Sequence, residues 1–281
     1  MRAKERFIMV EVKPPKNGDM APILKIIADL KEKGVTSITF PDRPGGIPRA
    51  DAVLTAVKVK DEINIDVVPH VACSGRDRVL LRSLLLGAHA NGIRNMFFVS
   101  GAQSSVNSGV SSAEVSVCSS LGLMELASDL NRFDLIKNPL RIGGTVNYKN
   151  IYIDEEIKLV RTKMEQGALF FFSHPVYTEE DVETVRQIAK STGANIYCSV
   201  MPAVSKKNAE FIRYHYPNVN IPEDLIERFN DAMTIEEAEY VGLANAKKML
   251  GYMDDFTYGY HFAFPFNRTY LLDELLPLLR R

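Results

Sequence analysis

A single acidic residue, Glu11, interrupts the apolar run "RFIMVEV" near the start of the chain, shortly before Pro14 and Pro15. An ionised carboxylate that leaves water costs on the order of several kcal/mol unless it is paired or hydrogen-bonded, so a buried glutamate tends to raise its pKa and keep a proton. A carboxyl with such a pKa is suited to general acid catalysis. The alternative is an edge strand that turns Glu11 toward water, and the position of the residue in the fold decides between the two.

Other candidate side chains also stand at the ends of apolar runs. They are Thr39, Asp42, His70, Asn147, His174 and Met201. Three have plain structural alternatives: His70 suits a hydrogen-bonded structural histidine, Asn147 suits a turn cap, and Met201 suits core packing. In a barrel of parallel strands, catalytic groups gather at the carboxyl ends of the strands, so we expect these residues to surround one pocket.

The elements that must position these residues alternate along the whole chain. Runs rich in Val, Ile and Phe begin at residues 6, 37, 66, 95, 141, 169, 195 and 259. Amphipathic stretches separate them, and several end at the glycine expected just past a helix. Two further helical stretches, 221–231 and 234–250, precede the last run. This order predicts an α/β protein with a single (β/α)8 barrel domain over residues 1–281 and extra helices before the last strand. A doubly wound sheet is less favoured, because the chain has no Gly-x-Gly-x-x-Gly turn.

The composition narrows the classes of partner and site. With 34 basic and 35 acidic residues, the chain gives no electrostatic reason to propose a nucleic acid or an anionic membrane as partner. Its cysteines form no Cys-x-x-Cys pair, which favours a reducing cytoplasm over a disulfide framework. The five histidines lack the paired helical spacing of a zinc site, so we expect no metal. No apolar run approaches membrane-spanning length, and the N-terminal run is too short and too charged for a signal peptide.

Seven blocks of the sequence, in order, resemble the methylenetetrahydrofolate reductases. "VEVKPP" is similar to the opening Phe-Glu-Phe-x-Pro-Pro of that family, "SITFPD" to its second strand and "PHVAC" to its Pro-His-Leu-Thr-Cys. "NGIRNMFFVSG", "EQGALFFFSHPVY" and "SVMPAVSKKNAEF" resemble the fourth, sixth and seventh strands, and "GYHFAFPFNR" resembles the last strand with its arginine. The sequences of these blocks are most similar to the reductase portion of bacterial fusions with homocysteine methyltransferase. This resemblance implies a role in one-carbon metabolism and methionine biosynthesis.

The resemblance implies a flavin-dependent barrel that reduces 5,10-methylenetetrahydrofolate to 5-methyltetrahydrofolate. In the family, the glutamate that matches Glu11 protonates N10 of the folate and opens the five-membered ring to an N5 iminium ion, which takes a hydride from reduced flavin. The matching folate contacts are His174, Met201 and Arg268. The implied flavin (FAD) contacts are Thr39, Phe40, His70, Gly101 and Lys163. NADH or NADPH is implied as the source of electrons, and the family is commonly homo-oligomeric.

The chain departs from the family around the flavin and the folate. The family's Arg-Gly-Asp after the fourth strand is "SGA" here, with Ser100 and Ala102 in place of the charged residues. The lost aspartate stabilises the cationic iminium in the family. At three further positions this chain carries another residue than the family. His174 stands in place of a glutamine, Thr162 in place of a helical arginine, and Lys206 in place of an aromatic residue that stacks on folate. Asp42 and Glu114 are the candidates to replace the aspartate.

Two alternative functions therefore remain open. One is a relative with lost or weakened flavin binding that transfers hydride directly from a nicotinamide or serves another folate one-carbon reaction, as Ser100, Ala102 and Thr162 suggest. The other is a non-catalytic folate-binding subunit whose electron carrier sits on a partner protein. Retention of Glu11 and His70 argues against the second, because a scaffold has no need of an acid at a strand end.

Overall fold

The computed structural model describes residues 7–101, 119–150 and 152–279 of the chain. Eight parallel strands in these residues form a closed barrel in the order β1 to β8. They are β1 (Phe7–Glu11), β2 (Ser37–Phe40), β3 (Asp66–Ala72), β4 (Asn95–Val99), β5 (Arg141–Val146), β6 (Ala168–Ser173), β7 (Ile196–Val200) and β8 (Gly259–Ala263). Each overlaps one of the apolar runs of the sequence, so the (β/α)8 prediction is confirmed. Ala102, Glu114 and Cys118 lie outside the described residues.

Helices follow the strands as the sequence pattern indicates. They are α1 (Ala21–Glu32), α2 (Ala52–Ile63), α3 (Arg78–Ala90), α4 (Ser120–Phe133), α5 (Ile153–Glu165), α6 (Glu179–Thr192), α7 (Lys206–His215), α8 (Glu223–Glu227), α9 (Ile235–Met253) and α10 (Leu276–Leu279). Short 3₁₀ turns are η1 (Pro44–Gly46), η2 (Pro265–Asn267) and η3 (Thr269–Glu274). The glycines expected after α1, α3 and α5 have φ angles of +86°, +73° and +90°, which glycine adopts without steric cost. No helix in the described residues is both long and apolar enough to cross a bilayer.

The chain divides into two compact units. The N-terminal unit comprises residues 10–145 and 162–170, and the C-terminal unit comprises residues 1–9, 146–161 and 171–281. Each is described by itself below. The single-domain organisation stays a prediction.

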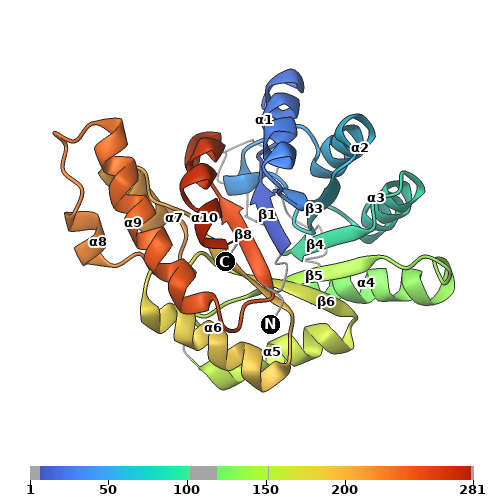
Figure 1. Ribbon diagram of the computed structural model, residues 1–281. Coiled ribbons are helices and arrows are strands. Elements are labelled where there is room, and N and C mark those ends of the chain that lie inside the picture. The colour runs from blue at the N-terminus through green and yellow to red at the C-terminus, as the bar shows by residue number, and fades with distance from the viewer. Residues whose placement is uncertain (1–6, 102–118, 151, 280–281) are drawn as a thin grey trace, which may run out of the picture. The chain divides into compact units, whose positions relative to one another are not determined.

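In the N-terminal unit, helices cover the parallel strands. Figure 1 shows α2 beside β3, with α3 following next to α2. The side chain of Asp51 accepts hydrogen bonds from the first amides of α2, at 2.8 and 3.1 Å, and Asp77 caps α3 through the amide of Leu80. Such caps satisfy amides that have no partner inside the helix. All four residues of β2 are buried, as expected for a strand covered on both faces.

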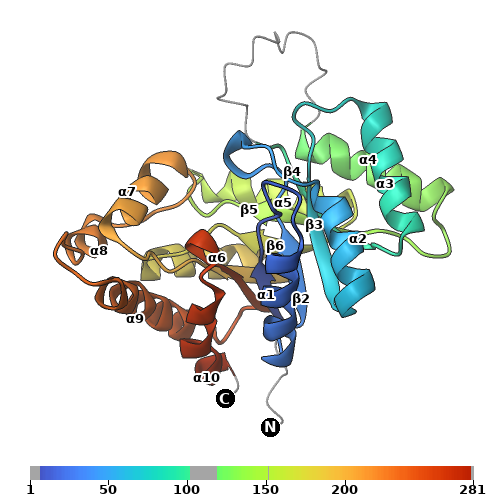
Figure 2. The ribbon, with the colours of Figure 1, turned by 90° about the horizontal axis from the view of Figure 1, so that it is seen from above.

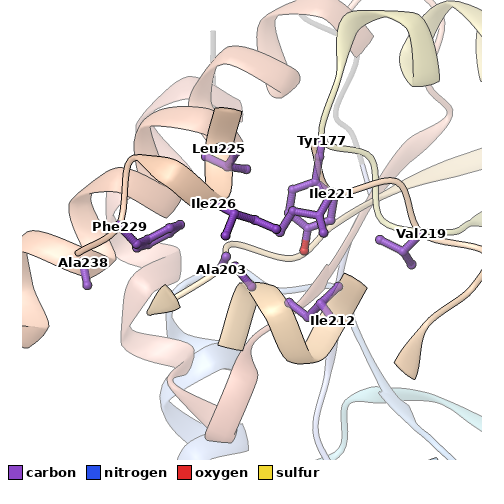
Figure 3. Close-up of a cluster of buried hydrophobic side chains, with 10 residues drawn as sticks. Tyr177, Ala203, Ile212, Val219, Ile221, Leu225, Ile226, Phe229 and Ala238 are labelled. Atoms are coloured by element: carbon purple, nitrogen blue, oxygen red, sulfur yellow. The ribbon is translucent and has the colours of Figure 1, made fainter. Parts of the chain in front are cut away.

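In the C-terminal unit, the two helices predicted before the last strand are present as α8 and α9. Figures 1 and 2 show α7, α8 and α9 side by side. They pack around a buried apolar cluster to which Tyr177, Ile212, Leu225, Ile226 and Phe229 belong (Figure 3). Each large side chain buried in this way stabilises the fold by roughly 1.5–3 kcal/mol. The helices are therefore anchored parts of the unit.

Candidate functional site

Glu11 is the last residue of β1. Part of the residue is accessible to solvent, yet the surrounding protein desolvates the carboxyl and raises its pKa, while the nearby ammonium of Lys13 opposes the shift more weakly. Among the described residues the carboxyl has no hydrogen-bond partner. Because the barrel is closed, β1 is not an edge strand, and Glu11 at its end is partly buried. A partly accessible carboxyl with a raised pKa can hold a proton and release it to a bound molecule.

Thr39 and Phe40 end β2, and both side chains are fully buried. The carbonyl of Thr39 accepts a hydrogen bond from the amide of Val12, at 2.9 Å. This bond joins the first residue after β1 to the end of β2. The structure therefore shows Thr39 and Phe40 inside the packed core, with their side chains inaccessible to solvent.

His70 lies within β3, and its imidazole packs against the ring of Phe97 with 4.7 Å between the centroids. Burial lowers the pKa of His70 from 6.5 to about 3. The residue is thus neutral at any physiological pH. It is a hydrogen-bond donor or acceptor, and it brings no positive charge to the end of β3.

Asp42 follows β2, and its carboxylate is held by two arginines. Arg43 Nε donates to Oδ1 at 3.1 Å, and Arg76 donates to Oδ2. The amide of Ala72 also donates to Oδ2, at 3.0 Å, and Arg76 reaches Asp51 at 3.2 Å. The Asp42 side chain is only 3% exposed. Asp42 therefore ties the loops after β2 and β3 together and presents no free negative charge that would replace the aspartate lost at position 102.

Gly101 follows β4 and has a φ angle of +86°. A Cβ atom at this position would lie 2.9 Å from the Cβ of Ala72 and 3.1 Å from the Cβ of Ser74. The amide of Ser74 donates to the carbonyl of Ser100, at 3.0 Å. The chain after β4 thus lies against the end of β3, and only glycine permits both the close approach and the backbone angle.

Lys163 lies on α5 and is buried, at 4% exposure. Its ammonium donates to the carbonyl of Thr145 in β5, at 2.6 Å. The charge is therefore directed at the backbone of a strand within the same unit, and the side chain fastens α5 to β5.

In the C-terminal unit, Asn147 caps a turn. Its side-chain oxygen accepts a hydrogen bond from the backbone amide of Lys149, at 3.1 Å. The backbone amide of Asn147 donates to the buried carboxylate of Glu156, at 2.9 Å. The turn-cap alternative for this residue is confirmed. His174 follows β6, is partly buried, and its amide donates to the carbonyl of Val146, at 3.3 Å. Met201 packs against the cluster of Figure 3, so core packing is confirmed for it as well.

Arg268 follows β8 and is fixed by Glu239 of α9. The guanidinium donates to Glu239 Oε1 at 2.6 Å, and the hydroxyl of Tyr270 donates to the same oxygen, also at 2.6 Å. The two residues before it, Phe266 and Asn267, have φ angles of +58° and +56°. Such backbone angles cost energy in residues other than glycine and persist where the surroundings enforce them. Arg268 is thus a positive group held rigidly on a strained turn.

One buried polar arrangement was not predicted from the sequence. His261 of β8 bonds to Ser199 Oγ of β7 at 3.1 Å and stacks on Phe172 of β6 with 4.4 Å between the centroids. Ser173 Oγ in turn accepts from the amide of Ser199, at 2.9 Å. The only sequence signal was a histidine in an apolar run, "GYHFAF". No group of His, Cys, Asp and Glu in the described residues is arranged to hold a metal ion.

The side chains predicted to contact FAD do not fit that role as they stand. Thr39 and Phe40 are buried, and the ammonium of Lys163 is bound to a strand carbonyl rather than presented as a point charge for a pyrophosphate. Of the five predicted FAD contacts, only Gly101 is exposed to solvent. Glu11, by contrast, meets the requirements of its predicted role, because its pKa is raised and it lies at the end of a strand.

Comparison with known proteins places the chain among folate-related barrels. The family model described as methylenetetrahydrofolate reductase matches residues 1–268. No curated protein matches the chain.

Solved structures share the fold. An uncharacterized protein from Clostridium thermocellum that binds two copies of 5-methyl-5,6,7,8-tetrahydrofolic acid is 15% identical, with a TM-score of 0.69, and the match covers 98% of this chain and 94% of that one. The aldolase QR15 is 12% identical, with a TM-score of 0.54 and 99% of each chain covered. A 2,3-dimethylmalate lyase is 10% identical, with a TM-score of 0.51, covering 98% of this chain and 81% of its own. At these identities the likeness concerns the fold alone.

Proposed function

The chain belongs to the methylenetetrahydrofolate reductase family, and from this membership we propose that it reduces 5,10-methylenetetrahydrofolate to 5-methyltetrahydrofolate with Glu11 as the general acid. The observation that carries the proposal is the raised pKa of the Glu11 carboxyl at the end of β1. Folate binding by the Clostridium thermocellum protein of the same fold supports the substrate class.

In the proposed reaction, the protonated Glu11 carboxyl gives its proton to N10 of the folate. The bond between N10 and the methylene carbon breaks, and its electron pair stays on N10, which leaves an N5 iminium ion. A hydride added to the methylene carbon then completes the methyl group. Burial raises the pKa of the carboxyl, which favours the protonated state that this first step requires.

His174, Met201 and Arg268 are proposed as folate contacts. Arg268 is the most informative of the three, because Glu239 and the strained turn hold it in one position. A fixed guanidinium can pair with a carboxylate through two parallel hydrogen bonds. His174 is partly exposed after β6, and Met201 has more contact with the core than with solvent.

Glu11→Gln tests the acid role. We expect formation of 5-methyltetrahydrofolate to fall about 10²–10⁴-fold, while binding of the product, measured by calorimetry, changes little. Glu32→Gln is the control, because Glu32 is an exposed carboxylate at the end of α1. Full turnover by Glu11→Gln with folate still bound would disprove the assignment. Absence of folate binding to the wild-type chain would disprove the substrate class instead.

The hydride in this reaction could come from reduced FAD or directly from a nicotinamide. The resemblance predicts reduced FAD, whereas the buried side chains of Thr39 and Phe40 and the occupied ammonium of Lys163 favour direct transfer from NADH or NADPH. The visible spectrum of gently purified protein, repeated after soaking in FAD and desalting, tests this choice. Flavin bands would support the flavin reaction. A colourless chain that transfers deuterium from the nicotinamide C4 to the methyl group would support direct transfer.

The remaining predictions concern assembly. Homo-oligomerisation is a proposal that rests on the resemblance. An electron-carrier subunit is proposed because the chain departs from the family around the flavin, and the single-domain organisation is proposed from the order of strands and helices in the sequence. Light scattering of the purified chain tests the first, and co-purification of a redox protein from the native source tests the second. A single cooperative transition in calorimetry tests the third.

A further inference from the structure

A cavity of about 290 Å³ lies at the amino ends of three strands of the N-terminal unit. Its wall includes the start of β3, the start of β4 and the start of β5, together with the last turn of α2 and the turn after α3. The charged side chains of the wall are Lys60, Asp66, Arg94 and Arg141. We call it the basal cavity. Glu11, Thr39 and Gly101 stand at the opposite, carboxyl ends of their strands.

The basal cavity carries an excess of positive charge. Three basic side chains and one acidic side chain line it, and within the described residues none of the four takes part in an ion pair. Other arginines of the unit, such as Arg76 and Arg82, are paired with aspartates. The three cations of the basal cavity therefore share one hollow with a single carboxylate, Asp66, and none of them is ion-paired with a described residue.

Helix dipoles do not account for this arrangement. A cation in the last turn of a helix is favourable against the carbonyl end of the helix, and Lys60 lies in the last turn of α2. Arg94 and Arg141, however, stand at the starts of β4 and β5. The main chain holds these two positions together, because the amide of Arg141 donates to the carbonyl of Arg94, at 2.8 Å.

We propose that the basal cavity binds a small polyvalent anion that carries phosphate or clustered carboxylate groups. Guanidinium groups bind both kinds of oxyanion through paired hydrogen bonds, and the ammonium of Lys60 adds a point charge. The volume suits a compact ligand, because pockets for larger molecules are usually bigger. This site lies away from the candidate folate site and does not depend on the proposed reaction.

Titration of the full chain with inorganic phosphate, and separately with succinate, at constant ionic strength tests the proposal. We expect one of the two anions to bind at a single saturable site, measured by calorimetry and by the rise in Tm. Lys60→Gln and Arg94→Gln should each weaken that binding about tenfold. The control is Lys58→Gln, which changes a lysine of the same helix that pairs with Glu62 and does not line the basal cavity.

Tighter binding of phosphate than of succinate would indicate a phosphate site, and the reverse order would indicate a carboxylate site. Circular dichroism of each variant verifies that it is folded, and Glu11→Gln should bind the anion as the wild type does, whatever its turnover. The proposal is overturned if neither anion binds, or if Lys60→Gln and Arg94→Gln bind as tightly as the control Lys58→Gln. The proposal would also be overturned if the rise in Tm depended only on ionic strength and not on which anion is added.

Discussion

Asp42 and Arg76 form a buried ion pair between the loops that follow β2 and β3. Arg43 donates to the same carboxylate, and the carbonyl of Ala72 accepts from Arg76 at 3.0 Å. The charge of Asp42 is therefore balanced within its own unit. A cationic reaction intermediate would gain little from it, because two guanidinium groups already compete for the carboxylate.

Asp42→Asn should destabilise the chain by about 3–5 kcal/mol, because it leaves the partly buried guanidinium of Arg76 without its main partner. Asp51→Asn is the matched control. Asp51 also contacts Arg76, but its side chain is 28% exposed, and asparagine caps a helix as well as aspartate does. Denaturant unfolding of both variants measures the difference. Equal losses would show that the Asp42 pair has no special role.

Gly101→Ala should destabilise the chain by about 1–3 kcal/mol from the backbone angle alone, and by more from the contact with Ala72. Gly18→Ala separates these two causes, since Gly18 has a φ angle of +77° and open space where its Cβ would stand. Thermal unfolding should therefore show a larger loss for Gly101→Ala. If the two variants lose the same stability, the close approach after β4 contributes nothing.

The barrel could be predicted from the sequence because its signals are local. Each apolar run is long enough to form a strand, and glycine marks several helix ends. The end of the chain shows the limit of this approach, because residues 269–279 are rich in leucine but form η3 and the short α10 instead of one long helix. Pro277 removes an amide and disfavours helical geometry in the residue before it. Pro265 is a similar local signal, because it begins the 3₁₀ turn η2 shortly after the end of β8.

The roles of single side chains were harder to predict, because they depend on residues far away in the sequence. Asp42 and Arg76 are 34 positions apart, and no local pattern indicates that they pair. Lys163 has the polar character of a helix-surface lysine, yet it is directed at the carbonyl of Thr145. The position of Glu11 at the end of β1 was predictable, because one acid at the end of an apolar run is a local signal.

His70 should show no change of charge between pH 5 and 8 in NMR titration of its ring protons, because burial lowers its pKa to about 3. The unfolded chain takes up this proton near pH 6.5 and the folded chain does not. The contribution of His70 to stability is therefore present above pH 6.5 and is lost as the pH falls toward 3. His70→Gln should remove this part of the acid sensitivity, and the exposed His215→Gln should serve as the control. A His70 resonance that titrates near pH 6.5 would contradict the prediction.

Tyr148 joins three loops of the C-terminal unit. Its hydroxyl donates to the carbonyl of Pro175 at 2.6 Å and accepts from the amide of Asn220 at 3.1 Å. Burial raises its pKa, so it stays a neutral donor. The neighbouring Lys149 donates to the carbonyl of Pro217, at 3.1 Å. The loop between α7 and α8 is therefore bound to the segments that follow β5 and β6.

Tyr148→Phe should cost about 1–3 kcal/mol, because a carbonyl and an amide in a partly buried setting lose their partner. Hydrogen exchange at the Asn220 amide should also become faster, while amides inside α9 keep their protection. Tyr240→Phe is the control, since Tyr240 is 72% exposed. Unchanged exchange at Asn220 would show that the loop is held by its other contacts.

Glu11→Gln should stabilise the chain at neutral pH even as it removes the proposed acid. The pKa of Glu11 is raised in the folded state from its usual value of 4.5, so the folded chain keeps a proton that the unfolded chain has lost. Stability therefore falls as the pH rises from 4.5 through the folded pKa, and the full penalty is present above it. Glutamine has no charge to desolvate, so the gain in Tm over wild type should be absent below pH 4.5 and grow as the pH rises through the folded pKa of Glu11. The same measurements on Glu32→Gln report the effect of removing an exposed carboxylate. A gain that does not depend on pH would mean that the pKa of Glu11 is the same in the folded and unfolded chains, and a carboxyl with an ordinary pKa has lost its proton well below neutral pH.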